Sequence, residues 1–278
     1  VLIKNPSYEY AGVYKLQDEG LSGEGIKVGC IVGDLTLAVA KDYGIPITDT
    51  YKFGAVDNKI PATGLQDENH AVQCATLING NRYIESGLPN CELYVASIAP
   101  MAASLDWLMS KGCNIIVISY GLGNDIGEVK SLLAKQKDIA IVVAGGNDFS
   151  EGSVLNGVAT TSTVNIGTHQ GFPCFLYLPT GQVDYSIFSN QVENLNAAKV
   201  DFAFQSGVLT ADWNGTTTSA RLVGGTSVAV MNAVSLLGLL KEKHPNYPMR
   251  TLVELLKITS RNAEKLIGSD YPIPTGKY

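Results

Sequence analysis

The feature that most constrains the fold is a series of short, almost wholly apolar runs that alternate with helical patterns. The four runs occupy residues 26–32, 93–98, 114–120 and 139–144. Runs this short, rich in Val and Ile, are typical of strands buried on both faces. Helical patterns lie between them at residues 101–111 and 126–137. The alternation predicts a parallel sheet with helical crossovers.

The length and composition fit one large α/β domain. The chain has 278 residues, of which 45% are hydrophobic and 17% charged, and we find no repeat or linker. We therefore expect a single domain over residues 1–278. The net charge of −6 argues against nucleic acid as a partner, because it leaves no basic footprint. No apolar stretch approaches the ~18 residues that a membrane span needs.

The cysteines indicate neither a disulfide framework nor a zinc site. They are Cys30, Cys74, Cys91, Cys113 and Cys174. Their number is odd, and no two have Cys-x-x-Cys spacing. We expect buried free thiols, no bound metal and no cofactor, and free thiols favour a reducing compartment. The chain begins at Val1 rather than Met, so we expect that an upstream segment was removed. Secretion after processing is the alternative to the reducing, intracellular compartment that the thiols favour.

Further elements are expected in both halves of the chain. Residues 7–19 predict a short helix. Residues 162–208 hold short apolar runs broken by Gly, Pro and Asn, which predict strands and loops. A long apolar helix is expected over residues 227–243, and an amphipathic helix over residues 248–259.

The residues that follow each apolar run are the first candidates for chemistry, because parallel sheets bind ligands beyond the carboxyl ends of their strands. Gly33 and Asp34 follow the first run, and glycine-rich segments at residues 121–123 and 145–147 follow the third and fourth. The long helix begins with Ser227 behind a pair of glycines. Such a serine is either a nucleophile that needs a base or a plain helix cap.

The base that this serine needs must be sought among three histidines. His244 precedes Pro245 at a helix end beside two lysines, and His169 lies in a polar turn. His70 opens a helix whose residues 71–78 are mostly small or apolar, so a buried helix would hold its side chain in place. We therefore take His70 as the candidate base, with a purely structural histidine as the alternative.

One glycine pattern points to a different chemistry. Residues 121–127 read GxGxxxG between a strand and a helix, which resembles a dinucleotide-binding loop. The pattern does not follow the first strand, and the next strand ends in Ala144 and two glycines rather than in Asp or Glu. We therefore set nucleotide binding aside.

Taken in order, these segments resemble the motifs of subtilases, the subtilisin-like serine peptidases. The segments are residues 23–31 (GEGIKVGCI), 67–75 (DENHAVQCA), 114–121 (NIIVISYG), 144–147 (AGGN), 200–203 (VDFA) and 224–229 (GGTSVA). The resemblance covers about residues 5–270. It implies a subtilisin-like three-layer α/β fold, with a mostly parallel central sheet flanked by helices. It also implies a serine endopeptidase that hydrolyses peptide bonds through an acyl-enzyme.

The resemblance also implies a role for each matching residue. Ser227 would attack the peptide carbonyl, His70 would act as general base, and Asn147 would donate to the oxyanion. The substrate-binding residues would be Ser119, Tyr120, Gly121, Ala144, Gly145 and Gly146, which bound the cleft. We expect a peptide or protein substrate there, and a propeptide or inhibitor is a candidate occupant.

The sequence departs from the family pattern at three places. Val32 stands where the catalytic aspartate should end the first strand, and its side chain cannot accept a hydrogen bond from imidazole. Asp34 is the candidate displaced acid, although an ideal strand would place it ~6.6 Å further along. Val230 and Met231 occupy the region where the serine motif normally holds a proline. Residues 79–87 are shorter than the family's calcium loop, so we expect no calcium.

Two functions therefore remain open at this stage. The first is an active endopeptidase that uses Asp34, His70 and Ser227. The second is a pseudopeptidase whose cleft binds an extended peptide or a partner protein along residues 119–121 by strand addition. The retained serine, histidine and asparagine favour activity, whereas Val32 favours the pseudopeptidase. Another acyl transfer, such as ligation, is a third and less favoured reading.

Overall fold

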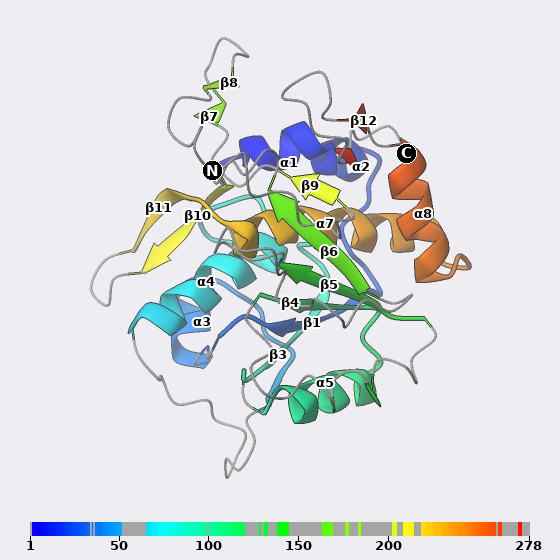
Figure 1. Cartoon of the computed structure of the whole chain (residues 1–278). Coiled ribbons are helices and arrows are strands. Elements are labelled where there is room, and N and C mark those ends of the chain that lie inside the picture. Colours follow the sequence, from blue (N-terminus) through cyan, green and yellow to red (C-terminus); the bar gives the residue numbers. More distant parts are fainter. Residues whose placement is uncertain are drawn as a thin grey trace.

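The computed structural model (Figure 1) describes most of the central sheet and the helices that pack on it. The described residues are 2–33, 35, 37–51, 65–98, 100–119, 128, 131–132, 138–144, 163–168, 176–177, 183–184, 202–204, 208–213, 218–259, 261–262 and 272–273.

A seven-stranded sheet forms the centre of the described part, and every neighbouring pair of strands in it is parallel. Its strands are β1 (Lys27–Ile31), β2 (Asp49–Tyr51), β3 (Glu92–Ala96), β4 (Ile115–Ile118), β5 (Ala140–Ala144), β6 (Thr163–Thr168) and β9 (Phe202–Phe204). They follow the order β2-β3-β1-β4-β5-β6-β9. The four apolar runs of the sequence are strands of this parallel sheet, as predicted, and they lie side by side in the order β3, β1, β4 and β5.

Helices cover both faces of this sheet, because its central strands are apolar on both sides. On one face α5 (Met101–Ser110) packs over a cluster that includes Ile31, Ile116 and Ile141. The other face carries a larger cluster that includes Val32. The helices of that face are α1 (Pro6–Ala11), α2 (Val13–Asp18), α3 (Leu37–Asp42), α4 (Leu65–Asn79), α7 (Thr226–Lys243) and α8 (Met249–Thr259). The result is the expected three-layer α/β arrangement (Figure 1).

Shorter strand pairs lie outside the main sheet. The antiparallel hairpin of β10 (Val208–Trp213) and β11 (Thr218–Val223) leads directly into α7. Two further antiparallel pairs are β7 (Leu176–Tyr177) with β8 (Val183–Asp184), and β12 (Arg261–Asn262) with β13 (Pro272–Ile273).

Two helix predictions differ from the structure. The helix expected over residues 7–19 is two helices, because Gly12 adopts a φ of 87° and its N–H caps the carbonyls of Tyr8 and Glu9. His70 does not open its helix, since α4 begins at Leu65 and places His70 in its second turn. The helix expected over residues 126–137 lies largely outside the described residues.

The sheet topology creates a crevice at the carboxyl end of β1. From β1 the chain moves to β2 and β3 on one side, and then returns to β4 on the other side of β1. In open parallel sheets such a reversal leaves a crevice beyond the strand ends, where ligands bind. Val32 and Gly33 follow β1 at this point, and Ser119 follows β4.

Two predictions about the whole chain, on its thiols and on membrane spans, can be compared with the described residues. Cys30, Cys74, Cys91 and Cys113 are buried free thiols, as expected, while Cys174 lies outside the described residues. Among the described helices none is long and apolar enough to cross a membrane. The single domain over residues 1–278 stays a prediction.

Candidate active site

His70 meets the end of β1 through a main-chain atom. Its Nδ1 lies 2.6 Å from the carbonyl oxygen of Val32. A carbonyl oxygen only accepts, so this hydrogen bond requires the proton on Nδ1, and in the neutral ring the lone pair is then on Nε2. The residue that replaces the family's aspartate thus contacts the imidazole through its backbone rather than through its side chain.

Two elements contact the main chain of Ser227, which lies in the first turn of α7. The Sγ of Cys74, in α4, lies 3.6 Å from the Ser227 carbonyl oxygen, and the Oγ of Ser119, after β4, lies 3.4 Å from the same atom. Cys74 follows His70 by four residues, so both side chains lie on one face of α4. The first turn of α7 is therefore tied to the helix that carries His70.

The Cys74 thiol, which contacts the Ser227 main chain, has low nucleophilicity. Burial raises its pKa to about 12, and a hydrogen bond from Ser119 offsets only part of this rise. A thiol is nucleophilic only as the thiolate. Cys74 therefore packs and donates a hydrogen bond to the Ser227 carbonyl, and its neutral thiol is a poor nucleophile.

The turn of α4 that follows His70 is also held by strand β10. The Oγ1 of Thr210, in β10, donates to the carbonyl oxygen of Gln73 over 2.7 Å. Both Gln73 and Thr210 are buried. The hairpin that leads into α7 thus holds the same turn of α4 that follows His70.

The structure places only some of the residues that the sequence predicted for the site. His70, Ser119 and Ser227 gather at the carboxyl ends of β1 and β4, and Ala144 ends the neighbouring strand β5. The remaining candidates lie outside the described residues; they are Asp34, Tyr120, Gly121, Gly145, Gly146 and Asn147.

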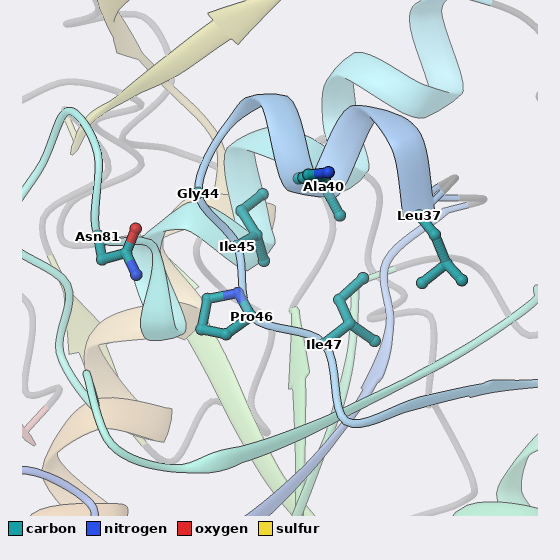
Figure 2. Close-up of a pocket in the computed structure, with 8 residues that line it drawn as sticks. Leu37, Ala40, Gly44, Ile45, Pro46, Ile47 and Asn81 are labelled. Carbon is teal, nitrogen blue, oxygen red and sulfur yellow. The ribbon is translucent and has the colours of Figure 1, made fainter.

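A separate cavity of about 330 Å³ lies between α3 and the segment that follows it. Figure 2 shows Leu37 and Ala40 of α3 facing Ile45 and Ile47, with Asn81 at the far side. No serine, cysteine, histidine or carboxylate is among its lining residues. Within the described residues, no group of three or more His, Cys, Asp or Glu side chains is arranged to hold a metal ion.

The family of the chain follows from a sequence comparison. The model of the subtilase family, Peptidase_S8, matches residues 36–271, which is well over half of the chain. The chain belongs to the subtilase family. The matched range contains His70, Asn147 and Ser227, but it begins after Val32 and Asp34, where the sequence departs from the family pattern.

Solved structures of subtilisin-like proteases superpose on this subtilase at low sequence identity. The PatG macrocyclase in complex with a peptide has 16% identity and a TM-score of 0.69, covering 95% of this chain and 92% of that chain. MycP1 from Mycobacterium smegmatis has 15% identity and a TM-score of 0.65, covering 98% and 84%. A mutant of the protease domain of PatA has 16% identity and a TM-score of 0.66, covering 92% and 95%. Comparison with curated proteins found no match.

These likenesses confirm the expected subtilisin-like α/β fold.

Sequence reasoning missed two features of the site. The contact of His70 with the Val32 carbonyl carries no side-chain signal, because every residue has such an oxygen. The position of Cys74 was readable, since its spacing of four residues from His70 predicts a shared helix face.

Proposed function

We propose that this subtilase is a serine endopeptidase that hydrolyses peptide bonds through an acyl-enzyme. Ser227 is the nucleophile, His70 the general base, and Asn147 an oxyanion donor. Asp34 supplies the carboxylate charge near the imidazole, in place of the aspartate that Val32 replaces. The observation that carries the proposal is the convergence of α4, β1, β4 and α7 at the sheet crevice, where His70 holds the tautomer of a base.

The substrate is a peptide or protein in extended form. The cleft residues would be 119–121 along one side and 144–146 along the other, and strand addition to residues 119–121 would supply main-chain hydrogen bonds. The similar PatG structure holds a peptide, which supports an extended peptide as the ligand of this chain. A propeptide or inhibitor would occupy the same cleft.

The alternative is a pseudopeptidase that binds peptides or a partner protein and does not cut them efficiently. The observation that favours it is Val32, whose fully buried side chain offers the imidazole no charge. In subtilisin, loss of the aspartate alone lowers kcat about 3 × 10⁴-fold, whereas loss of the serine or histidine lowers it about 2 × 10⁶-fold. A chain without any substitute acid would thus be a very slow enzyme.

The test is intact-mass detection of a fluorophosphonate adduct. We expect the parent chain to gain one adduct, Ser227→Ala to gain none, and Ser110→Ala, an exposed serine at the end of α5, to label like the parent. Asp34→Ala should lower the labelling rate by up to about 3 × 10⁴-fold, the cost of losing the acid in subtilisin.

Other outcomes of this experiment separate the two functions. An unlabelled parent that Val32→Asp converts into a labelled chain would establish the pseudopeptidase, whose only missing part is the acid. Labelling that is unaffected by Asp34→Ala would contradict the role given to Asp34 and leave the peptidase standing.

A further inference from the structure

The acceptor at His70 Nδ1 has a chemical consequence for the reaction. To take the proton of Ser227, the imidazole of His70 needs its lone pair on Nε2. An imidazole without a fixed partner at Nδ1 populates both tautomers, and one of them lacks that lone pair. The 2.6 Å bond to the Val32 carbonyl selects the Nδ1–H tautomer. The family's aspartate has two tasks: it orients the imidazole, and its charge stabilises the imidazolium. Here a main-chain carbonyl can perform the first task without the second.

The Val32 carbonyl is available because the strand ladder ends just before it. The Ile31 carbonyl oxygen still accepts from the N–H of Ser119 over 3.0 Å, as part of the β1–β4 pairing. Val32 lies beyond the last residue of β1, and its carbonyl turns to His70 instead. The chain then bends at Gly33, whose φ of 122° is a conformation that residues with a side chain rarely adopt.

Packing holds this carbonyl in place. The Val32 side chain is fully buried in the same hydrophobic cluster as Ala71 and Cys74 of α4. An acceptor on a packed strand end keeps its direction better than one on a long, mobile side chain. Val32 thus packs its side chain into the core and presents its carbonyl oxygen to His70.

We propose that the main-chain carbonyl of Val32, directed by the turn at Gly33, is the positioning group that orients the catalytic imidazole in this subtilase. This inference rests on the proposed role of His70 as general base. The carbonyl fixes the tautomer and the ring orientation, and Asp34 is not needed for either. Val32 and Gly33 are positioning residues, since neither exchanges a proton with the substrate.

The test is nitrogen NMR of chain labelled with ¹⁵N-histidine at about pH 8, where an ordinary histidine is neutral. The chain has three histidines, and the signals lost in His70→Gln identify those of His70. We expect a protonated Nδ1 and an unprotonated Nε2 in the parent. We expect the same in Asp34→Asn and in Val32→Ala, which keeps the carbonyl.

Gly33→Ala should move the carbonyl, because the added Cβ disfavours the φ of 122°. Its His70 signals should report a mixture of tautomers. Its fluorophosphonate labelling rate should fall by about 10²-fold or more, since a wrong tautomer costs about 10⁴-fold in a serine peptidase that has the same triad on an unrelated fold. Gly20→Ala is the matched control, because Gly20 has a φ of 94° and no atom within 4 Å of the added Cβ.

Three results would overturn the inference. They are an Nε2–H tautomer in the parent, loss of the Nδ1–H signal in Asp34→Asn, and a Gly33→Ala chain that matches Gly20→Ala. The first two decide the matter even where Gly33→Ala does not fold. The tautomer is read without catalysis, so a parent with the expected signals that takes up no fluorophosphonate would refute the proposed function, while the orientation of the His70 ring by the Val32 carbonyl would still stand.

Discussion

His70 meets a neutral acceptor at the position where other subtilases present a carboxylate. A neutral hydrogen bond fixes the proton on Nδ1, but it stabilises the imidazolium less than a charged partner does. The carbonyl of Val32 can therefore keep the tautomer, but the charge of the family's aspartate must come from another residue, a role that we propose for Asp34. Cys74 and Ser119 contact the main chain of Ser227, so Ser227 and His70 are positioned by separate contacts.

The Cys74 thiol should resist alkylation in the folded chain. Its pKa is raised to about 12 by burial, so only about one molecule in 10⁴ carries the thiolate at pH 8. Reactivity should grow only as the pH rises toward this pKa, because the thiolate is the reactive form. Iodoacetamide treatment followed by peptide mass mapping measures the alkylation of Cys74, with the chain unfolded in guanidinium as the control. Equal alkylation of Cys74 in both states would contradict the buried, neutral thiol.

At the scale of elements, α7 is the helix against which much of the molecule is assembled. Its first turn carries Ser227, and its middle packs against the segment that contains Gly87 and Leu88. The Oγ of Ser235 donates to the Met231 carbonyl over 2.7 Å and lies 3.2 Å from the Tyr8 hydroxyl. Tyr8 in turn donates to the Leu77 carbonyl of α4 over 2.6 Å. The two helices that bear His70 and Ser227 are thus joined through buried polar contacts.

Gly87→Ala should destabilise the chain by overpacking this junction. An added Cβ would lie 1.9 Å from the Oγ and 2.4 Å from the Cβ of Ser235, and the hydrogen bonds of Ser235 limit how far it can move. Overpacking of a buried contact costs about 1–3 kcal/mol. Urea unfolding followed by circular dichroism measures this loss in the free energy of unfolding.

The reference for this prediction is the parent chain. Gly87 is not among the glycines with a positive φ, so an alanine there meets the contact with Ser235 without added backbone strain. A Gly87→Ala chain no less stable than the parent would mean that α7 and the segment at Gly87 do not approach as closely as described.

At the scale of the whole molecule, the sheet and its main helices were predictable because burial leaves a pattern in the sequence. Residues 115–118, for example, are apolar at every position, and this pattern marks a strand covered on both faces. The start of α4 was not predictable from local signals, because Asp67 and Asn69 are good caps that here lie inside the helix. The acceptor of His70 was hidden for a different reason, since a main-chain oxygen has no residue identity.

The most direct test of the account is to trap the acyl-enzyme that it requires. The chain would be mixed with an activated ester of a short peptide, quenched in acid after milliseconds to seconds, and weighed by intact-mass spectrometry. The account predicts a transient gain of one acyl group, mapped to Ser227, that is absent from Ser227→Ala and much slower to form in His70→Ala. No gain, or an equal gain in Ser227→Ala, would contradict a nucleophilic serine at this site.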